Sequence, residues 1–143
     1  MSLLATVLVA SNAPAQRVGS LAIWKKRVLD PGALSLDVFP EATFNLKFTI
    51  DQIRLDETPA KMAVYLISVD DMAPAAEFFA KQLGVAVDVS GVGTMGEVRI
   101  IRAKEDDPKR AGLSIRVENA PWATGKGQIW LRYDAPAGSA AGT

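Results

Sequence analysis

The sequence predicts a single α+β domain, with a mostly antiparallel sheet and one principal helix packed on one face. Two observations carry this prediction. Residues 62–83 have the pattern of a strand, a turn and an amphipathic helix, and the later segments 113–117 and 128–133 alternate between apolar and polar residues as half-buried antiparallel strands do. The chain of 143 residues is long enough for one domain, and its 49% of hydrophobic residues can supply a core.

The first 15 residues are typical of a secretory signal peptide. The apolar run 3–10 is followed by Ala13-Pro14-Ala15, the small-residue spacing of a cleavage site before Gln16. No Lys or Arg precedes the run, so either the native start lies upstream of Met1 or the segment is not a signal, and a first β-strand is the alternative. We expect a periplasmic or secreted protein, with a cytoplasmic one as the alternative. We expect no membrane span, because crossing a bilayer takes about 20 apolar residues.

An N-terminal segment, 16–33, leads into the domain proper, 34–134. Two short strands are predicted at its start because their residues alternate: 34–39, which ends at Pro40, and 44–50 (FNLKFTI), whose aromatic and aliphatic residues share one face. A break at Thr58-Pro59 follows.

The strand–turn–helix segment is the strongest local signal. Residues 62–67 (MAVYLI) form a continuous apolar strand, and the carboxylates of Asp70 and Asp71 are suited to cap a helix over 71–83. Gly84 is the expected stop. The side chains expected in the core between this helix and the sheet are Met72, Phe79, Leu83, Val64 and Leu66.

Four strands are predicted after the helix, at 85–89, 97–103, 113–117 and 128–133. The charged segment 104–112 is predicted to be a solvated hairpin loop. Residues 135–143 have almost no core-forming side chain, so we expect a disordered tail.

Composition excludes several kinds of site. The chain has neither Cys nor His, so it has no Ser–His–Asp triad, no cysteine nucleophile, no disulfide and no zinc site built from these ligands. Its 16 Lys and Arg balance 16 Asp and Glu, which argues against nucleic-acid binding. Residues 91–96 match G-x-G-x-x-G, but a predicted strand follows where a dinucleotide site needs a helix, so we expect no cofactor. No calcium-loop pattern is present, and we expect no metal.

Three aromatic residues near the C-terminus are the candidate binding residues: Trp122, Trp130 and Tyr133. Trp122 lies at the centre of a glycine-containing loop, 119–127, where an exposed Trp can anchor a ligand or partner, although it can instead fold back over the sheet end. Trp130 falls on the strand face opposite Tyr133 and marks a binding surface if it is exposed.

Three segments resemble small exported bacterial domains of uncharacterised function. These segments are 38–42 (VFPEA), the strand leading into Asp70 and Asp71, and 77–84 (EFFAKQLG). In those domains a (Y/F)PxA segment precedes a strand, and a helix carries an FFxxxL or FYxxxL core. The resemblance covers roughly residues 36–133, although Glu41 stands where glycine is common and the cysteine of lipoprotein members is absent. It implies an envelope location and a non-catalytic role without an assigned ligand.

We therefore expect a non-catalytic exported module that binds a protein, a peptide or a small apolar ligand through its sheet or the Trp122 loop. One alternative is a cytosolic structural or assembly protein whose apolar N-terminal strand completes the sheet or pairs with another copy. The other is a histidine-independent enzyme, which needs Asp, Glu, Lys or Tyr side chains converging in a pocket.

Overall fold

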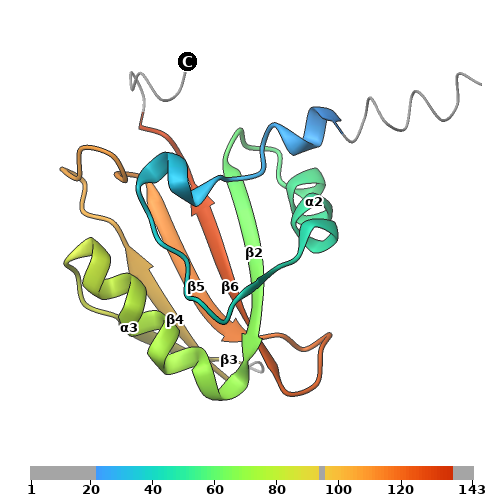
Figure 1. Ribbon diagram of the computed structural model, residues 1–143, viewed down its shortest axis with the longest axis vertical. Coiled ribbons are helices and arrows are strands. Elements are labelled where there is room, and N and C mark those ends of the chain that lie inside the picture. The colour runs from blue at the N-terminus through green and yellow to red at the C-terminus, as the bar shows by residue number, and fades with distance from the viewer. Residues whose placement is uncertain (1–21, 94–95, 137–143) are drawn as a thin grey trace, which may run out of the picture.

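The computed structural model describes residues 22–93 and 96–136, which form an open six-stranded sheet with helices beside it (Figure 1). The strand order is β1–β2–β6–β5–β4–β3, and every neighbouring pair is antiparallel. The predicted α+β class is confirmed. The strands are β1 (Thr43–Phe44), β2 (Lys61–Ser68), β3 (Asp88–Gly93), β4 (Gly96–Arg102), β5 (Leu113–Asn119) and β6 (Lys126–Tyr133). The helices are α2 (Leu46–Leu55) and α3 (Met72–Leu83), with the short 3-10 helices η1 (Pro31–Leu34) and η2 (Val69–Asp71).

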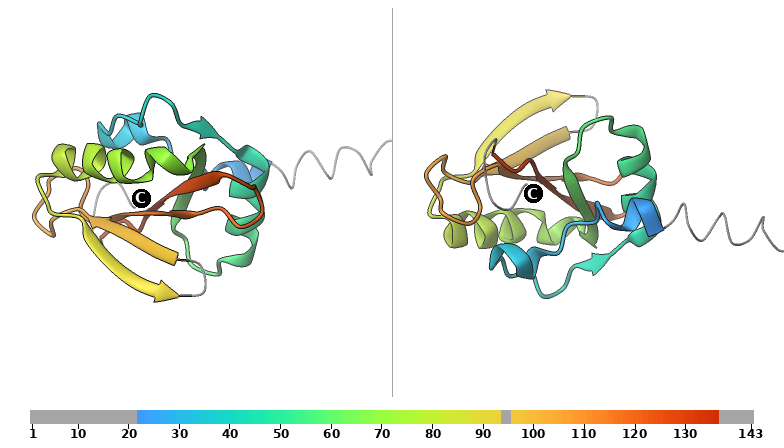
Figure 2. Two further views of the ribbon diagram at one scale, coloured as in Figure 1. Left: turned by 90° about the horizontal axis from the view of Figure 1, so that it is seen from below. Right: turned by 90° about the horizontal axis from the view of Figure 1, so that it is seen from above.

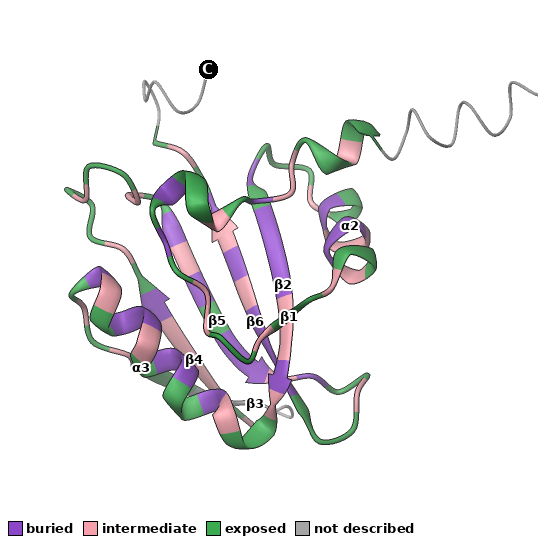
Figure 3. Cartoon of the chain, viewed as in Figure 1, coloured by how far each residue is buried: buried purple, intermediate pink, exposed green. Residues whose placement is uncertain are grey.

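Helix α3 covers one face of the sheet, and the main hydrophobic core lies beneath it (Figures 2 and 3). Phe79 is fully buried there, and Met72 and Leu83 are nearly so. The strands contribute their inward-facing residues, among them Ile67, Ile101, Ile115, Ile129 and Leu131. Gly84 ends the helix with a φ of 66°, as the sequence predicted.

Two expected core residues of β2 lie elsewhere. Val64 is buried and Leu66 is half-buried, but neither belongs to the core under α3. Successive strand residues point to opposite faces, and the β2 residues facing α3 are Ala63, Tyr65 and Ile67. A continuous apolar run does not reveal which alternate set faces which side.

The carboxylate cap predicted before α3 is absent. Asp71 occupies the N-cap position but makes no side-chain capping hydrogen bond. The turn is stabilised one step earlier, where the Ser68 hydroxyl oxygen accepts a hydrogen bond from the Asp70 backbone N–H at 3.3 Å and starts η2.

The strand predicted at 44–50 is wrong, because most of this segment belongs to α2. The Asn45 side chain accepts a hydrogen bond from the Phe48 N–H at 2.9 Å and so caps the first turn. The buried positions, Thr49, Ile50 and Ile53, follow helical spacing rather than alternation. The Thr49 hydroxyl also accepts the Val64 N–H at 3.0 Å, which fixes α2 against the edge of β2.

The strand predicted at 34–39 is also wrong. Asp30 accepts a hydrogen bond from the Gly32 N–H at 3.0 Å, and Pro31 has the φ that a helical turn needs, so the chain forms η1 here. Leu34 and Leu36 are both buried in the main core. The alternation in the sequence therefore reflects the burial of Leu34 and Leu36 and does not indicate a strand.

The N-terminal segment joins the domain through Arg27. Val28 forms a parallel bridge with Met62, which extends the outer edge of β2. The Arg27 side chain donates to backbone carbonyl oxygens in the last turn of α2 and in the segment that follows it. These acceptors belong to Ile53, Asp56, Thr58 and Ala60.

Most of the remaining boundaries lie close to their predicted places. β3 begins at Asp88, three residues later than predicted, and Val85 and Val87 pack against the core instead. Segment 104–112 connects β4 to β5. The predicted signal segment, 1–15, lies outside the described residues, as does 137–143 of the predicted tail. Within the described chain, no helix has both the length and the apolar character needed to cross a membrane.

Candidate functional site

The sheet face turned away from α3 carries arginine and tryptophan side chains in register. Arg102 on β4 is opposite Ser114 on β5, which is opposite Arg132 on β6. Two residues along β5, Arg116 is opposite Trp130 of β6. Each of these positions alternates with a core residue of its strand, so the pleat that buries the core side aims these side chains at the open face.

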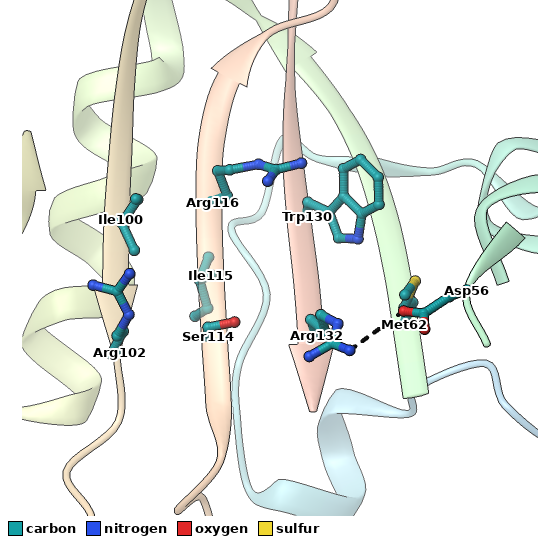
Figure 4. A pocket seen from close by; sticks show the side chains of 9 residues that line it. All are labelled: Asp56, Met62, Ile100, Arg102, Ser114, Ile115, Arg116, Trp130 and Arg132. Atoms are coloured by element: carbon teal, nitrogen blue, oxygen red, sulfur yellow. Dashed lines mark hydrogen bonds and ion pairs between the residues drawn. The ribbon is translucent and has the colours of Figure 1, made fainter. Parts of the chain in front are cut away.

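Two adjoining hollows lie over this face. The first has a volume of about 330 Å³ and is bounded on one side by Asp56, which follows α2 (Figure 4). Its lining consists of Asp56, Met62, Ile100, Arg102, Ser114, Ile115, Arg116, Trp130 and Arg132. The second, of about 470 Å³, continues along α2 and shares Asp56, Met62 and Trp130 with the first. Together they form a groove, which we call the Trp130 groove.

Arg116 is held in place by two neighbours. Its guanidinium carbon lies 4.6 Å from the centre of the Trp130 ring, within the range of a cation–π contact. Its Nε donates to Glu118 Oε1 at 2.9 Å, and that buried carboxylate also accepts from Gln128 Nε2 at 3.0 Å. The two terminal nitrogens of Arg116 make no hydrogen bond to any residue that the structure describes. The guanidinium is therefore oriented while several of its donors stay available.

Arg132 has more hydrogen-bond partners than Arg116, and both of its terminal nitrogens are engaged. Its Nη1 donates to Asp134 Oδ2 at 2.9 Å, and its Nη2 donates to Thr58 Oγ1 at 2.9 Å and to Asp56 Oδ2 at 3.4 Å. Partial burial works against the charge of Arg132, but the hydrogen bonds and negative charges of Asp134 and Asp56 outweigh burial and raise its pKa.

Asp56 is held in its ionised form at the rim of the groove. The Thr58 hydroxyl donates to Asp56 Oδ1 at 2.6 Å, and the Thr58 backbone N–H donates to the same oxygen at 2.8 Å. The hydroxyl hydrogen bond is the largest influence on this carboxyl. Burial opposes it, but with the backbone hydrogen bond and the Arg132 charge it keeps the pKa of Asp56 below its usual value.

Arg102 and Ser114 are the least engaged polar side chains of the groove. Arg102 approaches Asp88 Oδ2 at 3.9 Å, and both side chains are 64% exposed, so this ion pair is weak. The Ser114 hydroxyl makes no hydrogen bond to a described residue. Both side chains can therefore turn toward a ligand.

The three residues predicted to bind a ligand lie in different surroundings. Trp130 lines the groove. Trp122 is 43% exposed outside it, stacks on Phe48 with ring centres 4.8 Å apart, and donates its Nε1–H to Gln128 Oε1 at 3.3 Å. Phe48 also meets the Trp130 ring edge-on at 6.1 Å, so it links the two tryptophans. Tyr133 is buried in the core under α3, on the opposite face of the sheet, and does not join them.

Sequence reasoning missed the arginines and Asp56. The alternation of 113–117 and 128–133 puts Arg116 and Arg132 on the outward faces of their strands, but a local pattern does not reveal that β4 pairs with β5 and β5 with β6. The available signal was the recurrence of arginine at outward positions of three strands that follow one another along the chain, 97–103, 113–117 and 128–133. Consecutive strands pair often enough for that recurrence to suggest a shared surface.

No group of three or more metal-ligating side chains occurs among the described residues. The G-x-G-x-x-G segment joins β3 to β4, and a strand follows it as predicted, although residues 94–95 lie outside the described part of the chain. Comparison with protein-family models, with curated proteins and with solved structures gave no match to this chain.

Proposed function

We propose that this chain is a non-catalytic binding module and that its ligand lies in the Trp130 groove. The observation that carries the proposal is a hollow of about 330 Å³, open to solvent, in which a half-buried tryptophan and oriented arginine side chains converge. Ligand sites are typically concave, with apolar walls and a few placed polar groups. Met62 and Ile100 supply apolar wall here, and Arg116 and Ser114 supply hydrogen-bond donors.

The non-catalytic part of the proposal is supported by the state of Asp56. General acid–base catalysis needs a group whose pKa lies near the working pH. Asp56 is the carboxylate that lines both hollows, and Thr58 and Arg132 hold its pKa below the usual range, so it is ionised and already engaged at neutral pH. Such a carboxylate is suited to orienting Arg132 rather than to moving protons.

The experiment that tests the proposal is a fragment screen against the ¹⁵N-labelled chain, read from amide chemical shifts. We expect fragments to shift amides of β4, β5 and β6 around Trp130, and Trp130→Leu to abolish these shifts. Trp122→Ala is the matched control, because Trp122 is the more exposed tryptophan and lies outside both hollows. Shifts confined to the loop around Trp122, or no shifts at all, would overturn the proposal.

We also propose that the module acts outside the cytoplasm, in the periplasm or as a secreted protein. The support is the order of segments in residues 1–15, an apolar run followed by Ala13-Pro14-Ala15. N-terminal sequencing of the chain after expression from its native upstream region tests this. A product beginning at Gln16 in the periplasmic or secreted fraction supports export, and an intact product in the cytoplasm contradicts it.

A further inference from the structure

We propose that the Trp130 groove binds a small organic oxyanion, a carboxylate or phosphate on an apolar body, with the negative group over the Ser114 hydroxyl. This inference rests on the proposed binding function and names the chemical class of its ligand.

Ser114 lies at the centre of three arginines (Figure 4). Arg102 and Arg132 flank it on the two neighbouring strands, so their backbones are about 10 Å apart across two strand spacings. Arg116 lies two residues further along β5 on the same face, about 7 Å away along the strand. Arginine side chains from three neighbouring positions therefore surround the place of an anion over Ser114.

Arg102 and Arg116 retain donors that an oxyanion needs, whereas both terminal nitrogens of Arg132 already donate to Asp134, Asp56 and Thr58. Neither terminal nitrogen of Arg116 makes a hydrogen bond to a described residue, and the edge that carries them can pair with a carboxylate or phosphate in a two-pronged arrangement. Stacking on Trp130 and the hydrogen bond to Glu118 orient this guanidinium before a ligand arrives. Preorganisation of this kind reduces the entropy lost on binding.

The nearby carboxylates orient the arginines from outside the centre of the site. Glu118 lies beyond Arg116 along β5, and Asp134 lies beyond Arg132 past the end of β6. Among the side chains that line the first hollow, three arginines face one carboxylate, that of Asp56, which leaves an excess of two positive charges. The first hollow therefore carries a positive excess, although the carboxylate of Glu57 lines the second hollow and the whole chain has a formal net charge of zero.

The second hollow indicates that the ligand also has an apolar body. The apolar side of this hollow consists of Trp130, Met62 and Leu55, which is 77% exposed, and its polar side consists of Gln52, Asp56 and Glu57. A bare inorganic anion would leave this apolar surface in water, whereas an apolar group attached to the anion would cover it. The confined excess of positive charge also favours a small ligand over an extended polyanion, since the chain as a whole carries no basic excess.

The test titrates the full ¹⁵N-labelled chain with three probes of similar shape: phenylacetate, phenyl phosphate and the neutral phenylacetamide. We expect both anions to shift the amides around Ser114 and Arg116, with dissociation constants at least tenfold below that of the amide. Raising NaCl from 50 to 500 mM should weaken anion binding and leave amide binding unchanged. A stronger response to one anion identifies which oxyanion the site prefers.

Variants of Arg102, Arg116 and Ser114 test whether these side chains hold the anion. Arg102→Gln and Arg116→Gln should each weaken both anions at least threefold, and Ser114→Ala should weaken them as well. Arg99→Gln is the matched control, because it removes the same charge from β4 on the opposite face and should leave the titration unchanged. Equal binding of the amide and the anions in the groove would overturn the oxyanion proposal and leave the binding module standing. Absence of shifts with all three probes at tens of millimolar would overturn both.

Discussion

The guanidinium group of Arg116 lies over the ring of Trp130, with 4.6 Å between the guanidinium carbon and the ring centre. The two residues are direct partners in the pairing of β5 with β6, and the Phe48 ring meets Trp130 edge-on. The tryptophan thus forms both the floor of the groove and the support of the arginine beside it. This double role links the stability of the open face to the binding function proposed for it.

A double-mutant cycle measures this contact. The unfolding free energies of Arg116→Gln, Trp130→Leu and the double variant are compared with that of the parent in urea. The cycle cancels the contribution of the hydrogen bond from Arg116 to Glu118 and isolates the contact between Arg116 and Trp130. We expect a coupling energy of about 0.5–1 kcal/mol, the range for a cation–π contact that solvent reaches. A coupling energy indistinguishable from zero would show that the stacking does not stabilise the arginine.

Two glycines with positive φ allow the cost of an unfavourable backbone conformation to be distinguished from the cost of a steric clash. At Gly125, φ is +74° and a Cβ would meet nothing within 4 Å, so Gly125→Ala should cost about 1–2 kcal/mol of unfolding free energy. At Gly112, φ is +95° and a Cβ would lie 2.0 Å from the Asp134 carbonyl oxygen, so Gly112→Ala adds a backbone clash costing roughly 1–3 kcal/mol more. Thermal denaturation compares them, and equal losses would contradict the close approach at Gly112.

Arg27 joins the N-terminal segment to the end of α2, and its removal should be costly. Arg27→Met keeps most of the apolar stem but leaves the carbonyl oxygens of Ile53, Asp56 and Ala60 without this donor. Because these bonds come from a charged group, we expect a loss of about 1.5–3 kcal/mol in urea denaturation. The neighbouring exposed Lys26→Met is the control and should stay within about 0.5 kcal/mol of the parent. Equal effects of the two variants would mean that Arg27 is only a surface charge.

The main core gives a direct test of the strand–turn–helix segment. Phe79 is fully buried between α3 and the sheet, and Phe79→Ala should lower the free energy of unfolding by about 3–5 kcal/mol. Glu77→Ala, on the exposed side of the same helix, should change it by about 0.5 kcal/mol or less. A melting temperature that Phe79→Ala leaves unchanged would refute the packing of α3.

The same segment shows why part of the fold could be predicted from the sequence. In α3 the helical spacing of apolar residues, Pro74 in the first turn and Gly84 at the end all indicate a helix, and a helix forms there. In 44–50 the alternation of apolar residues suggests a strand, while the Asn45 cap and the burial of Ile53 belong to a helix. On the apparent strand face, Phe44 and Leu46 are about 40% exposed while Ile50 is buried, so the face is not buried along its length as a strand face would be.

The groove could not be predicted from the sequence, for a different reason. Trp130 could be singled out because it is a large aromatic residue at an outward strand position. Its neighbours Arg102, Ser114 and Asp56 come from three other segments and meet it only through strand order and through the placement of α2. Local patterns indicate which side of a strand a residue occupies, but not which residue of another strand lies opposite.

The charge of Asp56 should make the groove sensitive to acid. Its pKa is lowered in the folded chain, chiefly by the Thr58 hydroxyl, so the ionised form stabilises the fold above the unfolded value of about 3.9, and this stability is lost as pH falls through the folded pKa. Asp56→Asn keeps an oxygen for Thr58 but loses the charge beside Arg132, which is 3.4 Å away. Urea denaturation should therefore show the variant less stable than the parent at pH 6, with the difference shrinking below about pH 4. Thr58→Val should raise the Asp56 pKa in a ¹³C carboxyl titration, because the hydroxyl that donates at 2.6 Å is gone. A stability difference that stays constant from pH 6 to pH 3 would mean that this carboxylate contributes no charge-dependent stability.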